Sequence, residues 1–179
     1  MNNIFYPIDA FNNDKAPVVE FIDADCKTLI IAPITHAPRL KLGYKVVWVQ
    51  LFDSNRRIYL SRRASHLVTY PNLWDFSASG YILAGESCKD AALRELLLCF
   101  GIDKASLSNP RSYFFPLQEN FILSTLYTVS VMTTSIHFCY DYIQDGMFLD
   151  EDELTGFSSE LSEFLTPSLL WAIHNKIIF

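Results

Sequence analysis

The segment GYILAGESCKDAALRELLLCFGI, residues 80–102, constrains the fold of this chain more than any other stretch. It opens on a glycine-rich turn, after which Ser87 followed by Asp90 is typical of a helix N-terminus. Apolar residues then recur with helical spacing until Gly101, a residue type that commonly ends helices. The segment therefore predicts a loop that leads directly into an amphipathic helix.

The rest of the sequence predicts strands before and after this helix and further helix in the C-terminal segment. Runs rich in β-branched and aromatic residues, bounded by turn residues, are typical of strands. They occupy 18–22, 28–32, 44–52, 57–62, 74–77, 121–132 and 135–142. The tail 159–178 has a helical pattern, and Pro167 suits the first position of a final helix. Strands around a helix predict an α/β fold, a mixed sheet with helices packed on its faces.

Composition limits the classes of protein to consider. Half of the 179 residues are hydrophobic and the formal net charge is −6, so we expect one globular domain and no nucleic-acid partner. We expect residues 1–17 to form an N-terminal arm and 18–179 to form the domain. Apolar runs are too short for a membrane span. Four scattered cysteines and no secretory signal predict a cytoplasmic protein with reduced thiols.

Specific residues in 80–102 resemble the signature of a known family. The spacing of Gly80, Glu86, Arg94-Glu95-Leu96 and Gly101-Ile102 is similar to the Nudix box, G-x5-E-x7-R-E-U-x-E-E-x-G-U, where U is a bulky aliphatic residue. The preceding SRR at 61–63 and PNLWDFS at 71–77 resemble the Nudix branch related to isopentenyl-diphosphate isomerase. The resemblance implies a Nudix-type α/β/α sandwich with a mixed β-sheet between helices.

The resemblance also implies an activity and a set of site residues. Nudix enzymes typically use Mg²⁺ or Mn²⁺ and water to cleave a small-molecule diphosphate compound. Carried onto this sequence, Glu95 is the catalytic residue and a metal ligand, with Glu119 as a substitute ligand. Arg62 and Arg63 hold a phosphate of the substrate. Gly80, Glu86, Arg94 and Gly101 are the structural residues of the box, with Glu86 and Arg94 paired to brace the loop against the helix.

Two residues depart from the family signature. Positions 95, 98 and 99 are neighbours on one helix face, where a full signature has three glutamates. This chain has Leu98 and Cys99, and neither supplies the oxygen that Mg²⁺ prefers. Glu95 is then either a weakened catalytic residue or an ordinary polar residue of the helix. The apolar replacements also predict that this face is buried or covered by another segment or subunit.

Two functions therefore remain open. One is a hydrolase of a diphosphate-linked small molecule with a weakened metal site. The other is a degenerate Nudix domain that binds a ligand or a protein without hydrolysis, with a homodimer as one form of cover. Cys99 lacks a nearby histidine in the sequence and is rejected as a nucleophile. The acidic run 150–153 suits a solvated loop or a helix start better than a metal site.

Overall fold

The long apolar run predicted at 44–52 forms the central strand of the sheet, β3 (Gly43–Phe52). The computed structural model describes residues 16–108, 110–117, 120–132 and 136–179. β8 (Phe121–Ser130) runs parallel to β3 along its whole length, from Tyr44 opposite Ile122 to Phe52 opposite Ser130. Burial on both faces explains why β3 shows no polar alternation in the sequence.

The other strands extend the sheet from this parallel pair. β6 (Ala78–Tyr81) lies antiparallel to β3, and β7 (Arg111–Pro116) lies antiparallel to β8. A hairpin of β1 (Val18–Ile22) and β2 (Thr28–Pro33) joins β3 at one end. At the other end β4 (Ile58–Arg63) pairs with β3, β5 (Trp74–Asp75) and β9 (Ile143–Leu149).

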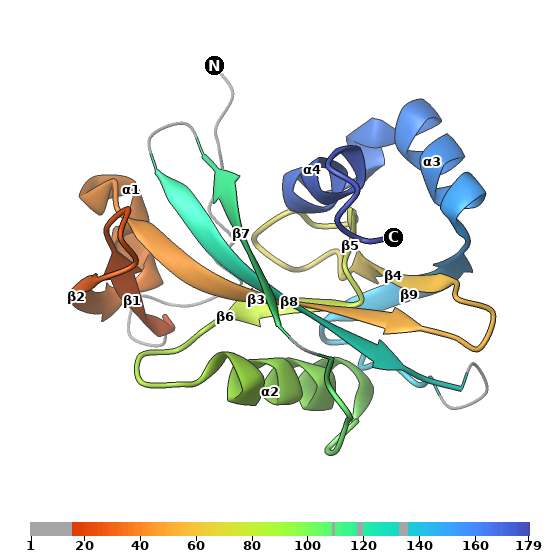
Figure 1. Ribbon diagram of the computed structural model, residues 1–179, viewed down its shortest axis with the longest axis horizontal. Helices are drawn as coiled ribbons and strands as arrows, with labels where there is room; N and C mark the ends of the chain where they lie inside the picture. Colours follow the sequence, from red (N-terminus) through yellow and green to blue (C-terminus); the bar gives the residue numbers. More distant parts are fainter. Residues whose placement is uncertain (1–15, 109, 118–119, 133–135) are drawn as a thin grey trace.

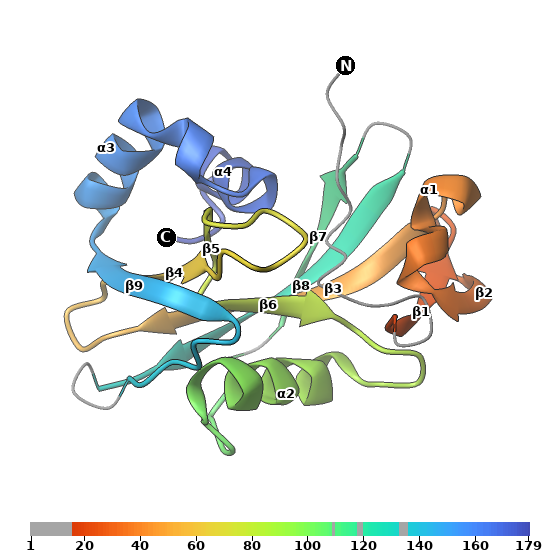
Figure 2. The ribbon, with the colours of Figure 1, turned by 180° about the vertical axis from the view of Figure 1, so that it is seen from behind.

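Helices cover both faces of this mixed sheet (Figure 1). α2 (Cys88–Phe100) lies on one face, and α3 (Glu151–Glu160) and α4 (Pro167–His174) lie on the other. The α1 turn (Ala37–Leu40) follows a 3₁₀ turn at Ile34–His36 beside the β1–β2 hairpin, and another 3₁₀ turn, Ser162–Phe164, precedes α4. The fold is therefore an α/β/α sandwich, as expected from the sequence (Figure 2).

Side-chain alternation along β3 divides the core into two layers. Val47, Val49 and Leu51 pack in the cluster that contains Leu96 of α2. Val46 and Trp48 point the other way, into the cluster that contains Leu169 and Ala172 of α4. Because successive strand residues face opposite sides, one continuous apolar strand supplies both layers.

The structure corrects one predicted strand and adds another. The strand predicted at 135–142 is wrong, because the described residues 136–142 contain no strand and the strand begins at Ile143. β7 was not predicted. The acidic run starts α3, where Asp150 and Glu153 form a reciprocal capping box. The predicted arm, 1–17, lies outside the described residues except for Ala16 and Pro17.

Candidate functional site

The predicted loop and helix of residues 80–102 are present. The Ser87 hydroxyl accepts a hydrogen bond from the Asp90 N–H at 3.1 Å, which begins α2. Gly101 ends the helix with a φ of 67°, a conformation that glycine adopts without strain. Gly85 in the loop has a φ of 77°. These local signals fix where α2 starts and where it ends.

An ion pair joins the loop to the helix. Arg94 donates from Nε to Glu86 Oε1 at 2.8 Å and from Nη2 to Glu86 Oε2 at 2.9 Å. The same Nη2 donates to the Tyr81 carbonyl at 2.7 Å, and Glu86 Oε2 accepts from the Leu83 N–H at 3.0 Å. This bidentate arrangement ties β6, the loop and α2 together.

The charge state of Glu86 follows from these contacts. Burial raises the pKa of the Glu86 carboxyl, but hydrogen bonds from Arg94 and from the Leu83 N–H outweigh burial and leave its pKa below the ordinary 4.5. Glu86 is therefore ionised at neutral pH and stays committed to Arg94.

Glu95 lies between Arg94 and the backbone of β6. Its Oε1 accepts a hydrogen bond from Arg94 Nη1. Only 11% of its side chain is exposed. A Cβ at Gly80 would meet Glu95 Oε1 at 2.0 Å, so the glycine leaves the space that the carboxylate occupies. Glu95 is thus a buried, charge-paired carboxylate.

The two residues that depart from the family signature differ from each other. Leu98 is 37% exposed, whereas Cys99 is 6% exposed. The Cys139 N–H donates to the Cys99 carbonyl at 2.8 Å, and the segment 139–142 then turns back toward β9. Burial, followed by the nearby negative charge of Glu95, raises the pKa of the Cys99 thiol, which is therefore protonated. The predicted cover of this face is present at Cys99 and comes from the same chain.

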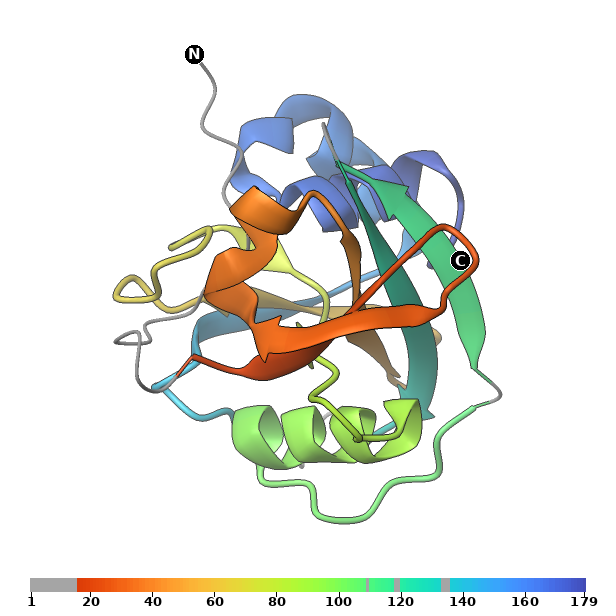
Figure 3. The ribbon, with the colours of Figure 1, turned by 90° about the vertical axis from the view of Figure 1, so that its left-hand side faces the viewer.

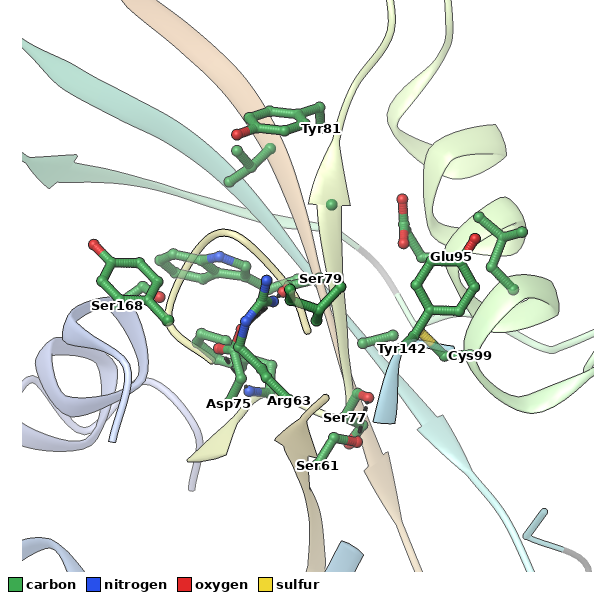
Figure 4. Close-up of a pocket in the computed structure, with 18 of the residues that line it drawn as sticks. Ser61, Arg63, Asp75, Ser77, Ser79, Tyr81, Glu95, Cys99, Tyr142 and Ser168 are labelled. Carbon is green, nitrogen blue, oxygen red and sulfur yellow. Dashed lines mark hydrogen bonds and ion pairs between the residues drawn. The ribbon is translucent and has the colours of Figure 1, made fainter. Parts of the chain in front are cut away.

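A cavity of about 170 Å³ opens beside these residues, around β6. Figure 4 places Arg63 and Asp75 on one side of β6 and Glu95, Cys99 and Tyr142 on the other. Serine hydroxyls and aromatic rings make up much of its wall. The aromatic members include Trp48, Tyr70, Phe76, Tyr81, Phe115 and Tyr142, and the serines are Ser61, Ser77, Ser79 and Ser168.

Of the two arginines predicted to hold a phosphate, Arg63 lines this cavity. Its Nε donates to the Thr69 carbonyl at 3.0 Å, and Nη1 lies 3.5 Å from Asp75 Oδ2. Arg62 instead donates to the Asn72 carbonyl at 3.0 Å and is not among the residues that form the cavity wall. The structure therefore brings Arg63 together with Glu95 around one cavity, but not Arg62.

Asp75 and Tyr142 are cavity residues that sequence reasoning gave no role. Asp75 accepts hydrogen bonds from Ser79 Oγ at 3.0 Å and Thr166 Oγ1 at 2.8 Å, which link the cavity to α4. Asp75 belongs to the PNLWDFS stretch, so a signal existed there. Tyr142 is the last residue of the segment wrongly predicted as a strand, and only the tertiary fold brings it beside α2.

Several proteins of other organisms are similar in sequence to this chain. No protein-family profile matches the sequence. The uncharacterized Nudix hydrolase lmo0368 of Listeria monocytogenes is 29% identical over 146 residues, 79% of this chain and 85% of the relative. An isopentenyl-diphosphate Δ-isomerase of Mycolicibacterium vanbaalenii is 34% identical over 87 residues, 46% of each chain.

A solved structure shares the fold of this chain. The crystal structure of DR0079 from Deinococcus radiodurans matches with a TM-score of 0.73 at 19% identity, over 88% of this chain and 98% of that one. The chain is thus similar in sequence to proteins named Nudix hydrolases and shares its fold with a solved structure. The isomerase match also agrees with the branch indicated by the residues at 61–63 and 71–77.

The Nudix resemblance implies Mg²⁺ or Mn²⁺, and the described residues do not fit such an ion. No three His, Cys, Asp or Glu side chains gather in a ligand-like group within the described ranges. Glu95 is engaged by Arg94, Leu98 has no ligand atom and the Cys99 thiol is protonated. Glu119, the expected substitute ligand, lies outside the described residues.

Among the described helices, none is both long and apolar enough to cross a bilayer.

Proposed function

We propose that this chain is a Nudix-fold protein that binds a small molecule in the cavity around β6 and no longer carries out Mg²⁺-dependent hydrolysis. The observation that supports this most directly is the state of Glu95. Its carboxylate is held by Arg94 against Gly80, and its helix neighbours Leu98 and Cys99 supply no oxygen ligand. Mg²⁺ requires several oxygen ligands in near-octahedral geometry, and one engaged carboxylate falls short of that.

The ligand that we propose is a diphosphate-linked small molecule. Arg63 lines the cavity, and its 3.5 Å contact with Asp75 is longer than a good charge-assisted hydrogen bond. A phosphate oxygen can therefore compete for the guanidinium. The aromatic wall around Trp48 and Phe115 suits a flat group at the other end of such a ligand. The cysteine usage favours a reducing, cytoplasmic setting.

A second candidate function is hydrolysis of the same class of compound. It is favoured by the position of Glu95 at the cavity and by relatives that are named Nudix hydrolases. In this case Glu119 supplies the missing oxygen ligand. The two functions make opposite predictions about metal dependence, which gives a direct test.

The test combines turnover and binding on the same protein. Phosphate release from a panel of nucleoside diphosphate derivatives is measured with Mg²⁺ or Mn²⁺, and binding of the same compounds is measured by calorimetry without metal. We expect binding without turnover in the wild type. Turnover that disappears in Glu95→Gln would establish the hydrolase instead.

Two variants locate the ligand. Arg63→Ala is expected to weaken metal-free binding on the order of tenfold or more, because a charged hydrogen bond to phosphate is lost. Arg62→Ala is the matched control, since the neighbouring arginine lies outside the cavity wall. Equal loss in both variants, or no loss in either, would place the ligand elsewhere.

A further inference from the structure

The loop between β4 and β5, residues 64–73, holds a tyrosine in an unusual backbone conformation. Figure 3 shows this loop, in yellow, on the side of the molecule opposite β7. Tyr70 has a φ of 48°, in the left-handed region that bulky side chains rarely adopt. Tyr70 is also partly buried and lines the cavity around β6. A strained residue therefore belongs to the wall of the candidate site.

The other non-glycine residues with a left-handed backbone lie in different surroundings. Four of them are exposed, in hairpin turns or at helix ends: Cys26, Lys41, Arg56 and Lys176. Asn72 has a φ of 64°, and asparagine tolerates this conformation. Among the described residues with a left-handed backbone, Tyr70 is thus the one aromatic side chain and the one non-glycine residue in the cavity wall.

Hydrogen bonds on both sides of Tyr70 fix its backbone. Arg63 Nε donates to the Thr69 carbonyl at 3.0 Å, and the Leu73 N–H donates to the Tyr70 carbonyl at 3.3 Å. The Arg63 N–H donates to the Leu73 carbonyl at 2.9 Å and joins the end of the loop to β4. Strained conformations persist where the surroundings fix them in this way, and they are common at ligand-binding sites.

The hydroxyl of Tyr70 lies on the charged side of the cavity. Arg63 and Asp75 line the same cavity, and the Arg63 guanidinium is held against the peptide next to Tyr70. Burial, followed by the negative charge of Asp75, raises the pKa of Tyr70, against the opposing effect of Arg63. The hydroxyl is therefore protonated at neutral pH and can donate a hydrogen bond near the guanidinium. Asp75 accepts hydrogen bonds from Ser79 and Thr166, which together with Arg63 offset its charge.

We propose that Tyr70 is a ligand-binding residue of this cavity, and that its hydroxyl and the Arg63 guanidinium bind the same phosphate. The inference rests on the proposed function, binding of a diphosphate-linked small molecule, and assigns a second group to its phosphate site. The hydroxyl makes the contact rather than the ring face, because the hydroxyl is the polar end of the side chain beside Arg63. The strained backbone at residue 70 places it there.

Metal-free calorimetry with inorganic pyrophosphate tests this assignment. Tyr70→Phe removes only the hydroxyl and is expected to raise the dissociation constant on the order of tenfold or more, the effect of one hydrogen bond to a charged group. Tyr113→Phe is the matched control, because Tyr113 is also partly buried but does not line the cavity. Far-ultraviolet circular dichroism of both variants checks that the fold is intact.

A comparison without ligand tests the backbone conformation. Tyr70→Gly is expected to be more stable to urea than Tyr70→Ala, because glycine adopts a φ of 48° without strain and alanine does not. At positions with an ordinary backbone the order is reversed, since glycine loses more freedom on folding. The reversed order at residue 70 would show that the loop does not impose the left-handed conformation, which would overturn the proposal.

The binding results separate this inference from the proposed function. A wild type and a Tyr70→Phe variant that bind pyrophosphate equally would overturn the inference and leave the proposed function standing. So would a Tyr70→Phe variant that loses affinity for nucleoside diphosphate derivatives but not for pyrophosphate, because the side chain would then contact the organic group. A wild type that binds the derivatives but not pyrophosphate would also overturn it. If the wild type binds none of these compounds, the proposed function fails as well.

Discussion

Gly80 lies on β6 directly against the carboxylate of Glu95. A methyl group there would come within 2.0 Å of Glu95 Oε1 and 2.2 Å of its Cδ. The carboxylate is held by Arg94 and cannot withdraw without breaking that contact. We expect Gly80→Ala to lower the free energy of unfolding by about 1–3 kcal/mol, the usual cost of overpacking. Urea denaturation of the wild type and of Gly80→Ala measures this loss.

Two comparisons separate this clash from a general glycine effect. Gly156→Ala in α3 is the control, because nothing lies within 4 Å of its new methyl group and alanine favours helix. In a Glu95→Ala background, Gly80→Ala should cost much less, since the clashing atoms are gone. An equal cost in both backgrounds would show that Glu95 does not occupy this space.

The ion pair of Glu86 and Arg94 predicts a pH dependence of stability. The pKa of Glu86 is lower in the folded protein than its ordinary 4.5. The stabilisation is therefore present above pH 4.5 and is lost as the pH falls through the folded-state value. We expect Glu86→Gln to cost about 1–3 kcal/mol at neutral pH and progressively less in acid. Urea unfolding midpoints across this range measure the difference.

A matched glutamate provides the comparison for this pH profile. Glu160 is exposed at the end of α3, so Glu160→Gln should change the unfolding midpoint little at any pH. If the difference between wild type and Glu86→Gln stayed constant from neutral to acidic pH, the ion pair would not be the source of the stabilisation.

In the helix α2, we expect a glutamate to lower stability much more at position 99 than at position 98. Cys99 is buried beneath the segment 139–142, next to Glu95. Cys99→Glu would bury a second carboxylate there, and we expect a loss of about 2–4 kcal/mol. Leu98 is partly exposed, so Leu98→Glu should change stability by less than about 0.5 kcal/mol. Thermal or urea unfolding compares the stability of the two variants with that of the wild type.

The pH dependence of this loss identifies its cause. A buried carboxyl beside Glu95 would have a raised pKa, so Cys99→Glu should be most harmful at neutral pH and less so in acid. Cys99→Gln is the control for size. Equal stability of Cys99→Glu and wild type at neutral pH would mean that the face is open rather than covered.

The same elements show what the sequence can and cannot predict. α2 was predicted closely, because Ser87 and Gly101 are local signals that depend on neighbours in the chain. The segment 136–142 has residues typical of a strand, yet the Cys139 N–H bonds to the carbonyl of Cys99 in α2 rather than to a sheet. β9 begins only at Ile143, and its Gly146 leaves room for the Tyr59 ring. These long-range contacts override local preference.

For the whole molecule, fold and site differ in how far the sequence determines them. The order of strands and helices indicated a mixed sheet with helices on its faces. The resemblance of residues 80–102 to the Nudix box implied the sandwich and the Glu86–Arg94 pair. The composition of the cavity was not predictable, because Trp48, Asp75 and Tyr142 come together only through the packing of β3, β5 and the segment before β9. That packing also decides which of two adjacent arginines faces the cavity.

The stability of the whole molecule offers a final test of metal independence. Any ligand that binds only the folded state raises the free energy of unfolding, by about 2.7 kcal/mol when its concentration is a hundredfold above its dissociation constant. The melting temperature rises with it. Because the described residues include no ligand-like group of three acidic, histidine or cysteine side chains, we expect neither Mg²⁺, Mn²⁺ nor a chelator to shift the melting temperature.

A diphosphate-linked small molecule should raise the melting temperature with or without Mg²⁺, and Arg63→Ala should reduce that rise. Arg62→Ala should retain it, because Arg62 does not line the cavity. A rise produced by Mg²⁺ alone and abolished by Glu95→Gln would contradict this prediction. In that case Glu95 must leave Arg94 to bind the ion, and ligands beyond those described here must complete its coordination.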